Sequence, residues 1–423
     1  MKKSLFIIAA TALVISCSSN DSFKEIDTQD VAIGFGDSHI GKITRSTVGT
    51  NAGEMKASNS NGTSSGTLCT VGNTMQVWGY KLNAAGTVYT TVFDATIVKY
   101  TDTQVSGTNW SYTYSGSTTP LRFWDRTASY KFYAVAPDDK FTMPAPTGSG
   151  ENLANTESAR KFSATGIPDV QILKDHNGAS AVTISNEGQA NESTTGTAVD
   201  YLVSSVTSCA AGYANQGNDA NDKNVNFTFN HILSKLNVNV KTTATFNNQD
   251  SNYPQIKLTS LTISIKGVAQ QFDQLTAGAL TPALSNGDKW TTATTTATSK
   301  TCFAIGGSVA AELLSTTNFN AASYFVSPTT TGSTTPALEE GEAEVKFVVG
   351  YDIYYDGNST STSMESCLSE EYTVTALNKI QQNTINNLNI TIDPKAIYFD
   401  VQSVANWSDT QGSYDVIVPP TNE

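Results

Sequence analysis

The sequence predicts an all-β protein, and three observations support this. Short runs in which apolar and polar residues alternate recur along the chain, and they are rich in β-branched and aromatic side chains. No long segment has the period of an amphipathic helix. Thr, Ser, Asn and Gly dominate the remainder, which favours strands and turns. The number and spacing of the runs favour antiparallel β-sandwiches.

The predicted strands are short segments separated by polar or Gly-rich breaks. They cover residues 31–35, 130–134, 201–203, 225–229, 236–240, 261–265, 345–349, 388–392, 397–401 and 414–418. Two Thr-rich, nearly uncharged segments, 291–301 and 327–336, are expected to be surface loops. A chain of 423 residues has room for two domains, and the Asn/Asp/Gly-rich segment 210–224 is the predicted boundary between them.

The first 17 residues predict export. Lys2 and Lys3 precede an apolar run, residues 5–15, that is too short to cross a bilayer and has the basic flank of a secretory signal peptide. The run ends in Val14-Ile15-Ser16-Cys17, which resembles the lipobox of bacterial lipoprotein precursors. That resemblance implies removal of residues 1–16 and acylation of Cys17. Two or more acyl chains anchor a protein stably. Because no other segment of the sequence is long and apolar enough to cross a membrane, membrane contact is expected only through the lipid.

Charge and cysteine content limit the partners and the covalent links. Removing residues 1–16 takes away two lysines, which changes the formal charge from −13 to −15. A chain this acidic repels nucleic acid, so no nucleic-acid partner is expected. The four remaining cysteines could form two disulfides or stay as buried thiols, and both alternatives stay open: Cys69, Cys209, Cys302 and Cys367.

The sequence offers no catalytic, cofactor or metal site. No HExxH or CxxC spacing occurs. His231 has no recognisable nucleophile or orienting carboxylate beside it and is interpreted as structural. The oxygen-rich segment 219–224 lacks the glycine and glutamate of an EF-hand, and 339–344 is interpreted as a charged turn. A glycosidase carboxylate pair stays open, because its separation is a three-dimensional quantity.

The tryptophans have two interpretations. An exposed tryptophan can stack on a sugar ring, whereas packing inside a β-sandwich is the commoner role. The five are scattered along the chain: Trp78, Trp110, Trp124, Trp290 and Trp407.

Several motifs in order resemble the fimbrillin family of Bacteroidetes, the subunits of type V pili. They are the lipobox, the first strand at 31–35, Lys42-Ile-Thr44-Arg45-Ser46, the strand and proline at 130–137, Asp200-Tyr201-Leu202-Val203, Phe229/His231/Lys235/Leu236, and the end from Asn389 through Ile392, Ile397, Phe399 and Val401 to Trp407. The resemblance covers most of the chain. It implies two transthyretin-like antiparallel β-sandwich domains and no enzymatic activity.

The resemblance also implies a route of assembly. The lipoprotein reaches the outer membrane, and a trypsin-like protease then cuts after an arginine that follows the first strand. Loss of that strand, carried by Val31, Ile33 and Phe35, would open a sheet for a donor strand of the next subunit. The expected pro-segment is 17–45, followed by domains at 46–222 and 223–423.

Arg45, followed by Ser46, is the predicted cleavage position. The chain has four arginines: Arg45, Arg122, Arg126 and Arg160. Arg45 lies in a Gly/Ser/Thr-rich stretch of the kind in which proteolytic nicking concentrates. Arg122 and Arg126 flank Phe123-Trp124 and are expected to be shielded by a folded sheet. Lys42 would also suit a less selective protease.

The tail at 412–418 is the predicted donor strand. Tyr414, Val416 and Val418 alternate in the manner of the first strand, and Pro419-Pro420 then ends the pairing because proline has no N–H group. The alternative that this is the last strand of its own domain stays open.

These inferences give a leading function and two alternatives. The leading function is a polymerising pilus subunit in the fimbrium at the cell surface, with adhesion to host or bacterial ligands. Its expected partners are copies of itself, related pilus subunits and an outer-membrane anchor subunit. The alternatives are a non-polymerising anchor or tip subunit and a surface glycan-binding lipoprotein.

Overall fold

The computed structural model confirms the all-β fold class. It describes residues 31–36, 39–40, 74–82, 88–105, 108–114, 116–143, 163–167, 170–174, 184–185, 189–190, 199–213, 224–243, 254–266, 269–273, 289–292, 298–305, 310–328, 344–360, 362, 364–377, 380–393 and 396–405. These residues contain β-strands and one 3₁₀-helix, η4 (Thr375–Leu377). Within these ranges no helix is long and apolar enough to span a membrane.

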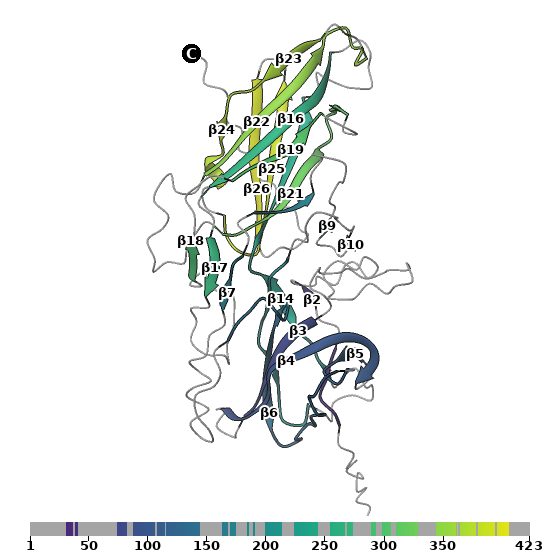
Figure 1. Cartoon of the computed structure of the whole chain (residues 1–423), viewed down its shortest axis with the longest axis vertical. Helices are drawn as coiled ribbons and strands as arrows, with labels where there is room; N and C mark the ends of the chain where they lie inside the picture. The colour runs from purple at the N-terminus through teal and green to yellow at the C-terminus, as the bar shows by residue number, and fades with distance from the viewer. Residues whose placement is uncertain are drawn as a thin grey trace, which may run out of the picture.

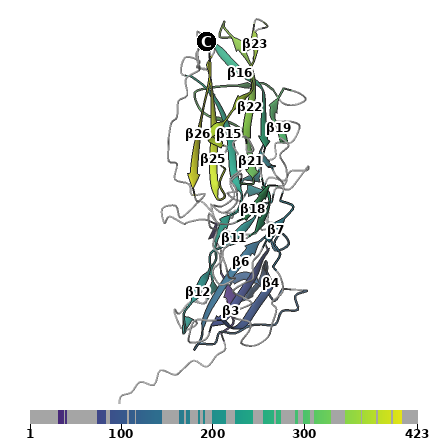
Figure 2. The same ribbon diagram turned by 90° about the vertical axis from the view of Figure 1, so that its left-hand side faces the viewer.

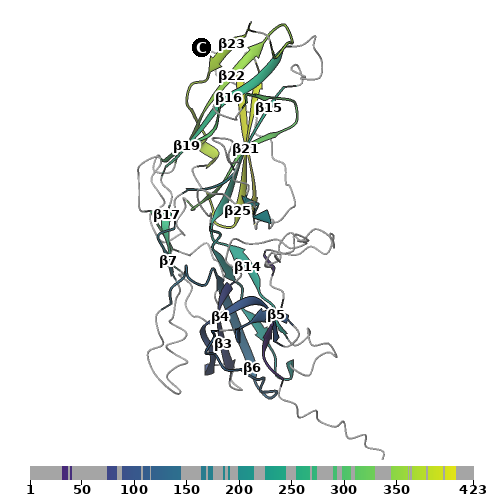
Figure 3. The same ribbon diagram turned by 45° about the vertical axis from the view of Figure 1, so that its right-hand side comes forward.

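The first sheet has ten strands. They are β1 (Gly34–Phe35), β2 (His39–Ile40), β3 (Thr74–Leu82), β4 (Val88–Val105), β5 (Thr108–Ser111), β6 (Ser129–Ala136), β11 (Leu202–Ser204), β12 (Thr207–Cys209), β13 (Asn224–Val225) and β14 (Thr228–His231). Figure 3 shows β3, β4, β5, β6 and β14 together at one end of the molecule.

This sheet closes on itself. Its order runs β13-β1-β5-β4-β3-β6-β11-β14-β2. The two ends of that order are neighbouring pieces of the same segments, because β13 and β14 lie within 224–231 and β1 and β2 within 34–40. β1 pairs with β13 and β2 with β14, at sequence offsets of 190 and 189 residues (224 − 34, 228 − 39). Strands β1 and β2 therefore form the position at which the ring of strands closes.

The second half of the chain, together with the earlier strand β8, forms a sandwich of two sheets. One sheet has the order β26-β25-β15-β21-β8 and the other β19-β16-β22-β23, with β20 and β24 at its margins. Their strands are β8 (Val170–Lys174), β15 (Ser234–Thr242), β16 (Gln255–Lys266), β19 (Thr298–Ala304), β20 (Glu312–Leu313), β21 (Phe319–Val326), β22 (Glu344–Tyr354), β23 (Glu365–Leu368), β24 (Tyr372–Thr373), β25 (Thr384–Asp393) and β26 (Ala396–Ala405).

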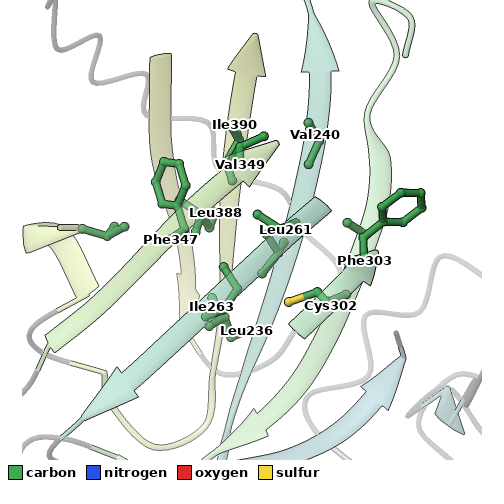
Figure 4. Close-up of a cluster of buried hydrophobic side chains, with 14 of the residues drawn as sticks. Leu236, Val240, Leu261, Ile263, Cys302, Phe303, Phe347, Val349, Leu388 and Ile390 are labelled. Carbon is green, nitrogen blue, oxygen red and sulfur yellow. The ribbon is translucent and has the colours of Figure 1, made fainter. Parts of the chain in front are cut away.

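The alternation seen in the sequence builds the core of this sandwich. Successive side chains of a strand point to opposite faces, so every second residue enters the core. In β15, Leu236, Val238 and Val240 are fully buried while the residues between them are partly exposed. Figure 4 shows Leu236 and Leu388 from one sheet meeting side chains of the facing sheet.

Two small sheets complete the description. β7 (Ser163–Thr165), β17 (Ala269–Asp273) and β18 (Lys289–Thr292) form one, and β9 (Ile184–Ser185) and β10 (Gln189–Ala190) form the other. The chain changes from the closed sheet to the sandwich between His231 and Ser234. Strands β7 and β8 pair with β17 and β21, so an earlier part of the chain also joins the later sheets. The predicted domains at 46–222 and 223–423 stay a prediction.

An apolar junction joins the two parts. The molecule is elongated, with β3, β4 and β6 towards one end and β16, β22 and β23 towards the other (Figures 1 and 2). Between them, Phe325 of β21 and Phe272 of β17 belong to one buried cluster with Trp78 and Tyr133 of the closed sheet. Trp78 and Tyr133 stack at a centroid distance of 5.2 Å. Burial of this size makes the junction part of the folding unit rather than a free linker.

Most predicted strands are confirmed. Nine of the ten predicted runs fall in or beside described strands, and 414–418 lies outside the described residues. The strands that were not predicted include β3, β4, β5, β8, β19 and β21. In β21 the residues from Ala321 to Val326 are all buried, because one face meets the sandwich core and the other meets the junction. A strand covered on both faces loses its alternation.

Three expectations are wrong in part. The segment 291–301, expected to be a loop, contains the end of β18 and the start of β19, because β-branched threonine suits a strand. Ser327, expected in a surface loop, is fully buried. The expectation of antiparallel pairing also fails for β1–β13, β2–β14 and β15–β25, which are parallel. These partners are far apart in sequence, so no tight hairpin constrains their direction.

Phe325 generates a stability prediction for the junction. Phe325→Ala removes a ring that is 1% exposed and leaves a cavity between the two parts. The expected loss in free energy of unfolding is about 3–5 kcal/mol, measured by denaturant titration. Leu368→Ala is the matched control, since Leu368 is 73% exposed, and it should change stability by less than about 0.5 kcal/mol. Equal losses in free energy of unfolding for the two variants would show that Phe325 does not stabilise the junction.

The cysteines generate a second prediction. Cys209, Cys302 and Cys367 are free thiols, whereas Cys69 lies outside the described residues. Burial raises the pKa of the Cys209 thiol to about 12. Because only the thiolate reacts, Cys209 should resist iodoacetamide at pH 8 in the folded protein and react after unfolding. Peptide mass spectrometry measures this, and half-buried Cys367 serves as the more accessible comparison. Rapid labelling of native Cys209 would contradict its burial.

Candidate functional site

The candidate site is the position of the first strand in the closed sheet. Backbone bonds hold this strand on both sides. On one side Ile33 N donates to Arg122 O at 2.8 Å, and Trp124 N donates to Val31 O at 2.9 Å. On the other side Gly36 N donates to Val225 O at 3.0 Å. We call the residues that contact 31–36 the first-strand site.

Phe35 is the main side-chain anchor in this site. It is fully buried and lies opposite Trp110 of β5 in register. Its ring stacks on Phe227 at a centroid distance of 5.9 Å. Edge-to-face contacts complete the surround, with centroid distances of 5.4 Å to Phe93, 5.9 Å to Tyr112 and 6.3 Å to Phe132. The site therefore has a box built for an aromatic side chain.

Ile33 and Val31 continue the inward face. Ile33 is fully buried in the same core cluster, and Val31 is partly buried against it. Ala32, between them, bridges to Phe123, whose side chain is 47% exposed. The strand thus inserts its side chains at every second position, as the sequence predicted. The placement agrees with a displaceable first strand formed by Val31, Ile33 and Phe35, but displacement itself stays a prediction.

The Tyr112 hydroxyl links the first strand to its neighbour. It donates to the Ile33 carbonyl at 3.0 Å and accepts from Arg122 N at 3.1 Å. Burial raises the pKa of this hydroxyl above its ordinary value, so it stays protonated and able to donate. One buried side chain therefore supplies the hydrogen-bond partner of two backbone groups, the Ile33 carbonyl and the Arg122 N–H. Sequence reasoning did not find Tyr112, because nothing in its local pattern marks a hydroxyl that reaches residues 79 positions away.

The segment beside the first strand is held in turn by polar contacts. Asp125 N donates to the Tyr130 hydroxyl at 2.7 Å, and Lys81 Nζ donates to Asp125 Oδ2 at 2.5 Å. The Lys81 ammonium group holds the pKa of the Asp125 carboxyl well below its usual range. Trp124 packs edge-to-face on Tyr130 at 4.9 Å. These contacts fix the strand neighbour independently of the first strand.

The arginines differ in part from expectation. Arg122 is exposed rather than shielded by the sheet. Its backbone is nevertheless bonded at both groups, N to Tyr112 and O to Ile33. Arg126 is half-buried, and its carbonyl accepts from Gly212 N at 2.8 Å. A protease needs an extended, free backbone, so both positions are poor substrates in the folded chain.

Several predicted site residues lie outside the described residues. They are the lipidation residue Cys17, the processing residues Arg45 and Ser46, and the tail residues Tyr414, Val416 and Val418. Their roles stay predictions. The segment 219–223 and residues 339–343 also lie outside.

His231 has a partner that the sequence did not reveal. Its Nδ1 lies 2.8 Å from the Asp200 carboxylate, and both side chains are buried. The expectation that no orienting carboxylate is near was wrong, because Asp200 is distant in sequence but lies beside His231 where β11 pairs with β14. The pair is interior, next to the point where the chain enters the sandwich, which fits the structural role predicted for the histidine.

The three tryptophans whose side chains are described lie in the core. Trp78, Trp110 and Trp124 are all at most 7% exposed, so these three cannot serve as stacking platforms for sugars. Trp407 lies outside the described residues, and the side chain of Trp290 is not described. Within the described ranges, no three His, Cys, Asp or Glu side chains cluster as metal ligands.

Comparisons with known proteins find similarity in structure but not in sequence. No protein-family model matches the chain, and no curated protein matches it. A fimbrial protein from Bacteroides vulgatus has 16% identity and a TM-score of 0.40, covering 79% of this chain and 93% of its own. The tip fimbrial protein Mfa3 from Porphyromonas gingivalis has 10% identity and a TM-score of 0.31, covering 79% and 94%. A candidate cell adhesion protein from Bacteroides uniformis has 12% identity and a TM-score of 0.33, covering 89% and 98%.

These neighbours include fimbrial proteins of Bacteroidetes, the group that the sequence resembles. At these TM-scores and identities the similarity establishes no function for this chain. The function of this chain is therefore inferred from the geometry of the first-strand site.

Tyr112→Phe tests the hydroxyl link. The variant keeps the ring but removes the partner of the buried Ile33 carbonyl and of the Arg122 N–H, at a cost of about 1–3 kcal/mol. Faster hydrogen exchange is expected at the amides of Ile33 and Trp124. Tyr114→Phe is the control, because that ring is half exposed and lies two residues away. Unchanged exchange in the Tyr112 variant would show that the hydroxyl does not hold the strand.

Proposed function

We propose that this protein is a structural subunit of a type V pilus, exported as a lipoprotein and polymerised by strand exchange. Acylation of Cys17 would deliver it to the outer membrane, and cleavage after Arg45, before Ser46, would release it from the lipid. The chain would lose its first strand in the same step. A strand from another subunit, donated by the tail at 412–418, would then fill the first-strand site.

The observation that carries the proposal is the place of the first strand in the ring. Strands β1 and β2 close a sheet whose other strands belong to residues 74 and beyond. The segment carries an aromatic anchor and bonds on both sides, yet Ile40 lies only five residues before Arg45 (45 − 40). One cut could therefore separate the closing strand from the strands that it closes.

Loss of the strand would leave a site with strong affinity for a replacement. The backbone groups of Arg122, Trp124 and Val225 would lose their partners, and buried groups of this kind cost free energy when unpaired. The box around Phe35 would also open to water. Strand addition restores both the backbone bonds and the alternate side-chain contacts. A stable non-covalent joint between subunits follows from replacing a strand in a core.

The proposed partners are copies of this chain, related pilus subunits and an outer-membrane anchor subunit. The proposed location is the outer membrane before processing and the fimbrium afterwards, with adhesion as the outcome. An anchor role would require the lipid to remain on Cys17. A glycan-binding role lacks support from Trp78, Trp110 and Trp124, which are buried.

Arg45→Ala tests the proposal in the native host. Wild-type surface protein should begin at Ser46 and run as detergent-stable polymers, whereas the variant should keep acylated Cys17 and stay monomeric. N-terminal sequencing, intact mass and electrophoresis without heating measure these outcomes. Arg160→Ala is the matched control and should be processed normally. Wild-type protein that still begins at acylated Cys17 would contradict polymerisation and would favour an anchor or a glycan-binding lipoprotein.

A further inference from the structure

The first-strand site also favours one direction for a replacement strand relative to the first strand. Its three inward positions differ in character: an aromatic box at Phe35, a closed aliphatic position at Ile33 and a partly open one at Val31. The tail supplies three inward side chains with the same spacing, Tyr414, Val416 and Val418. Matching the side chains of the tail to the positions of the site distinguishes the two possible strand directions. The pattern of backbone hydrogen bonds beside Phe123 is compatible with both directions.

Resting on the strand-exchange function proposed above, we infer that the tail of one subunit enters the first-strand site of the next in the opposite direction to the first strand. Tyr414 then occupies the box of Phe35, Val416 the position of Ile33, and Val418 the position of Val31. Tyr414 is thus the residue that specifies the joint.

The aromatic box gives the first argument. Four rings surround Phe35, at centroid distances between 5.4 and 6.3 Å. A valine there would leave a cavity, because its side chain is much smaller than a phenyl ring. Tyr414 is the only aromatic residue among residues 408–423. The box therefore selects Tyr414 from the tail.

The position of Ile33 gives the second argument. If the tail ran in the same direction as the first strand with Tyr414 in the box, the residue two places earlier, Gly412, would fall at Ile33. A glycine would leave that buried position empty. In the opposite direction the residue two places later, Val416, falls there and fills it. Only the reversed strand fills both buried positions.

Proline gives the third argument. In the same direction with Val418 in the box, Pro419 would take the place of Gly36. Gly36 N donates to Val225 O at 3.0 Å, and proline has no N–H to replace it. In the reversed direction the backbone groups of each position turn to the opposite neighbour, so the N–H that would face Val225 O comes from Tyr414, which is not a proline. Pro419 then lies beyond the position of Val31, where the strand leaves the site.

The backbone beside Phe123 accepts either direction. The first strand runs antiparallel there, with Ile33 N bonded to Arg122 O and Val31 O bonded to Trp124 N. A reversed strand would be parallel, and one residue opposite Phe123 would then supply both groups. That residue is Ile417, at the position of Ala32. In the same-direction arrangement with Val418 in the box the residue is Asp415, so the two arrangements place different side chains beside Phe123.

Cysteine pairing at Phe123 tests the direction. Full-length chains that carry F123C with I417C, or F123C with D415C, are expressed in the native host, and surface polymers are dissociated by heat without reductant. Reversed docking should give inter-subunit disulfide ladders with I417C and none with D415C, and F123C alone should give none. Peptide mass spectrometry confirms the 123–417 link and separates it from links to native Cys367.

Tail substitutions provide a second readout. Y414A should shorten the lifetime of polymers in detergent by about a hundredfold or more, as for loss of a buried aromatic ring. Y414F should stay close to wild type, and V418A should have an effect of only a few fold. The opposite ranking of Y414A and V418A would overturn the inferred direction.

The outcomes separate this inference from the function on which it rests. A D415C ladder, or polymers with neither ladder, would overturn the reversed docking while strand exchange or another joint still forms the polymer. Wild-type protein that never polymerises would overturn the proposed function and the docking together. An I417C ladder with the predicted ranking would support both.

Discussion

The structure of the first sheet depends on backbone pairing at one position, that of the first strand. Bonds from Ile33 and Gly36 to two different neighbours convert an open sheet into a ring. Around this pairing the side chains form the core, with Phe35 among four rings. The Tyr112 hydroxyl completes the same joint from inside. Closure removes the exposed sheet edges that would otherwise pair without control.

Much of the fold could be predicted from the sequence because each strand has its own pattern of alternating apolar and polar residues. The alternation of Leu236, Val238 and Val240 reflects a strand with one buried face, and period two reports that directly. β21 was not predicted because both of its faces are buried and no alternation results: Tyr324 and Phe325 belong to different buried clusters. The ring closure and the parallel pairs could not be predicted, since a local pattern does not say which distant strand is the neighbour.

The candidate site was predictable to a similar degree. Val31, Ile33 and Phe35 stood out through their spacing, and the structure puts Ile33 and Phe35 at the centre of a core. The Asp200 partner of His231 and the hydroxyl contacts of Tyr112 could not be predicted. Each depends on two residues that are distant along the chain and meet only through the register of the sheet. Residues that act through tertiary contacts leave no local signature.

The parallel pairing of β1 with β13 has a consequence for the order of folding. Gly34 meets Asn224, so 190 residues separate the two sides of this contact (224 − 34). The first strand is synthesised early, but its site in the sheet is incomplete until residues 224–231 have been synthesised. Contacts of such high sequence separation form late because loop closure opposes them. Among the described strands, β1 is therefore the first to be translated and one of the last to pair in the sheet.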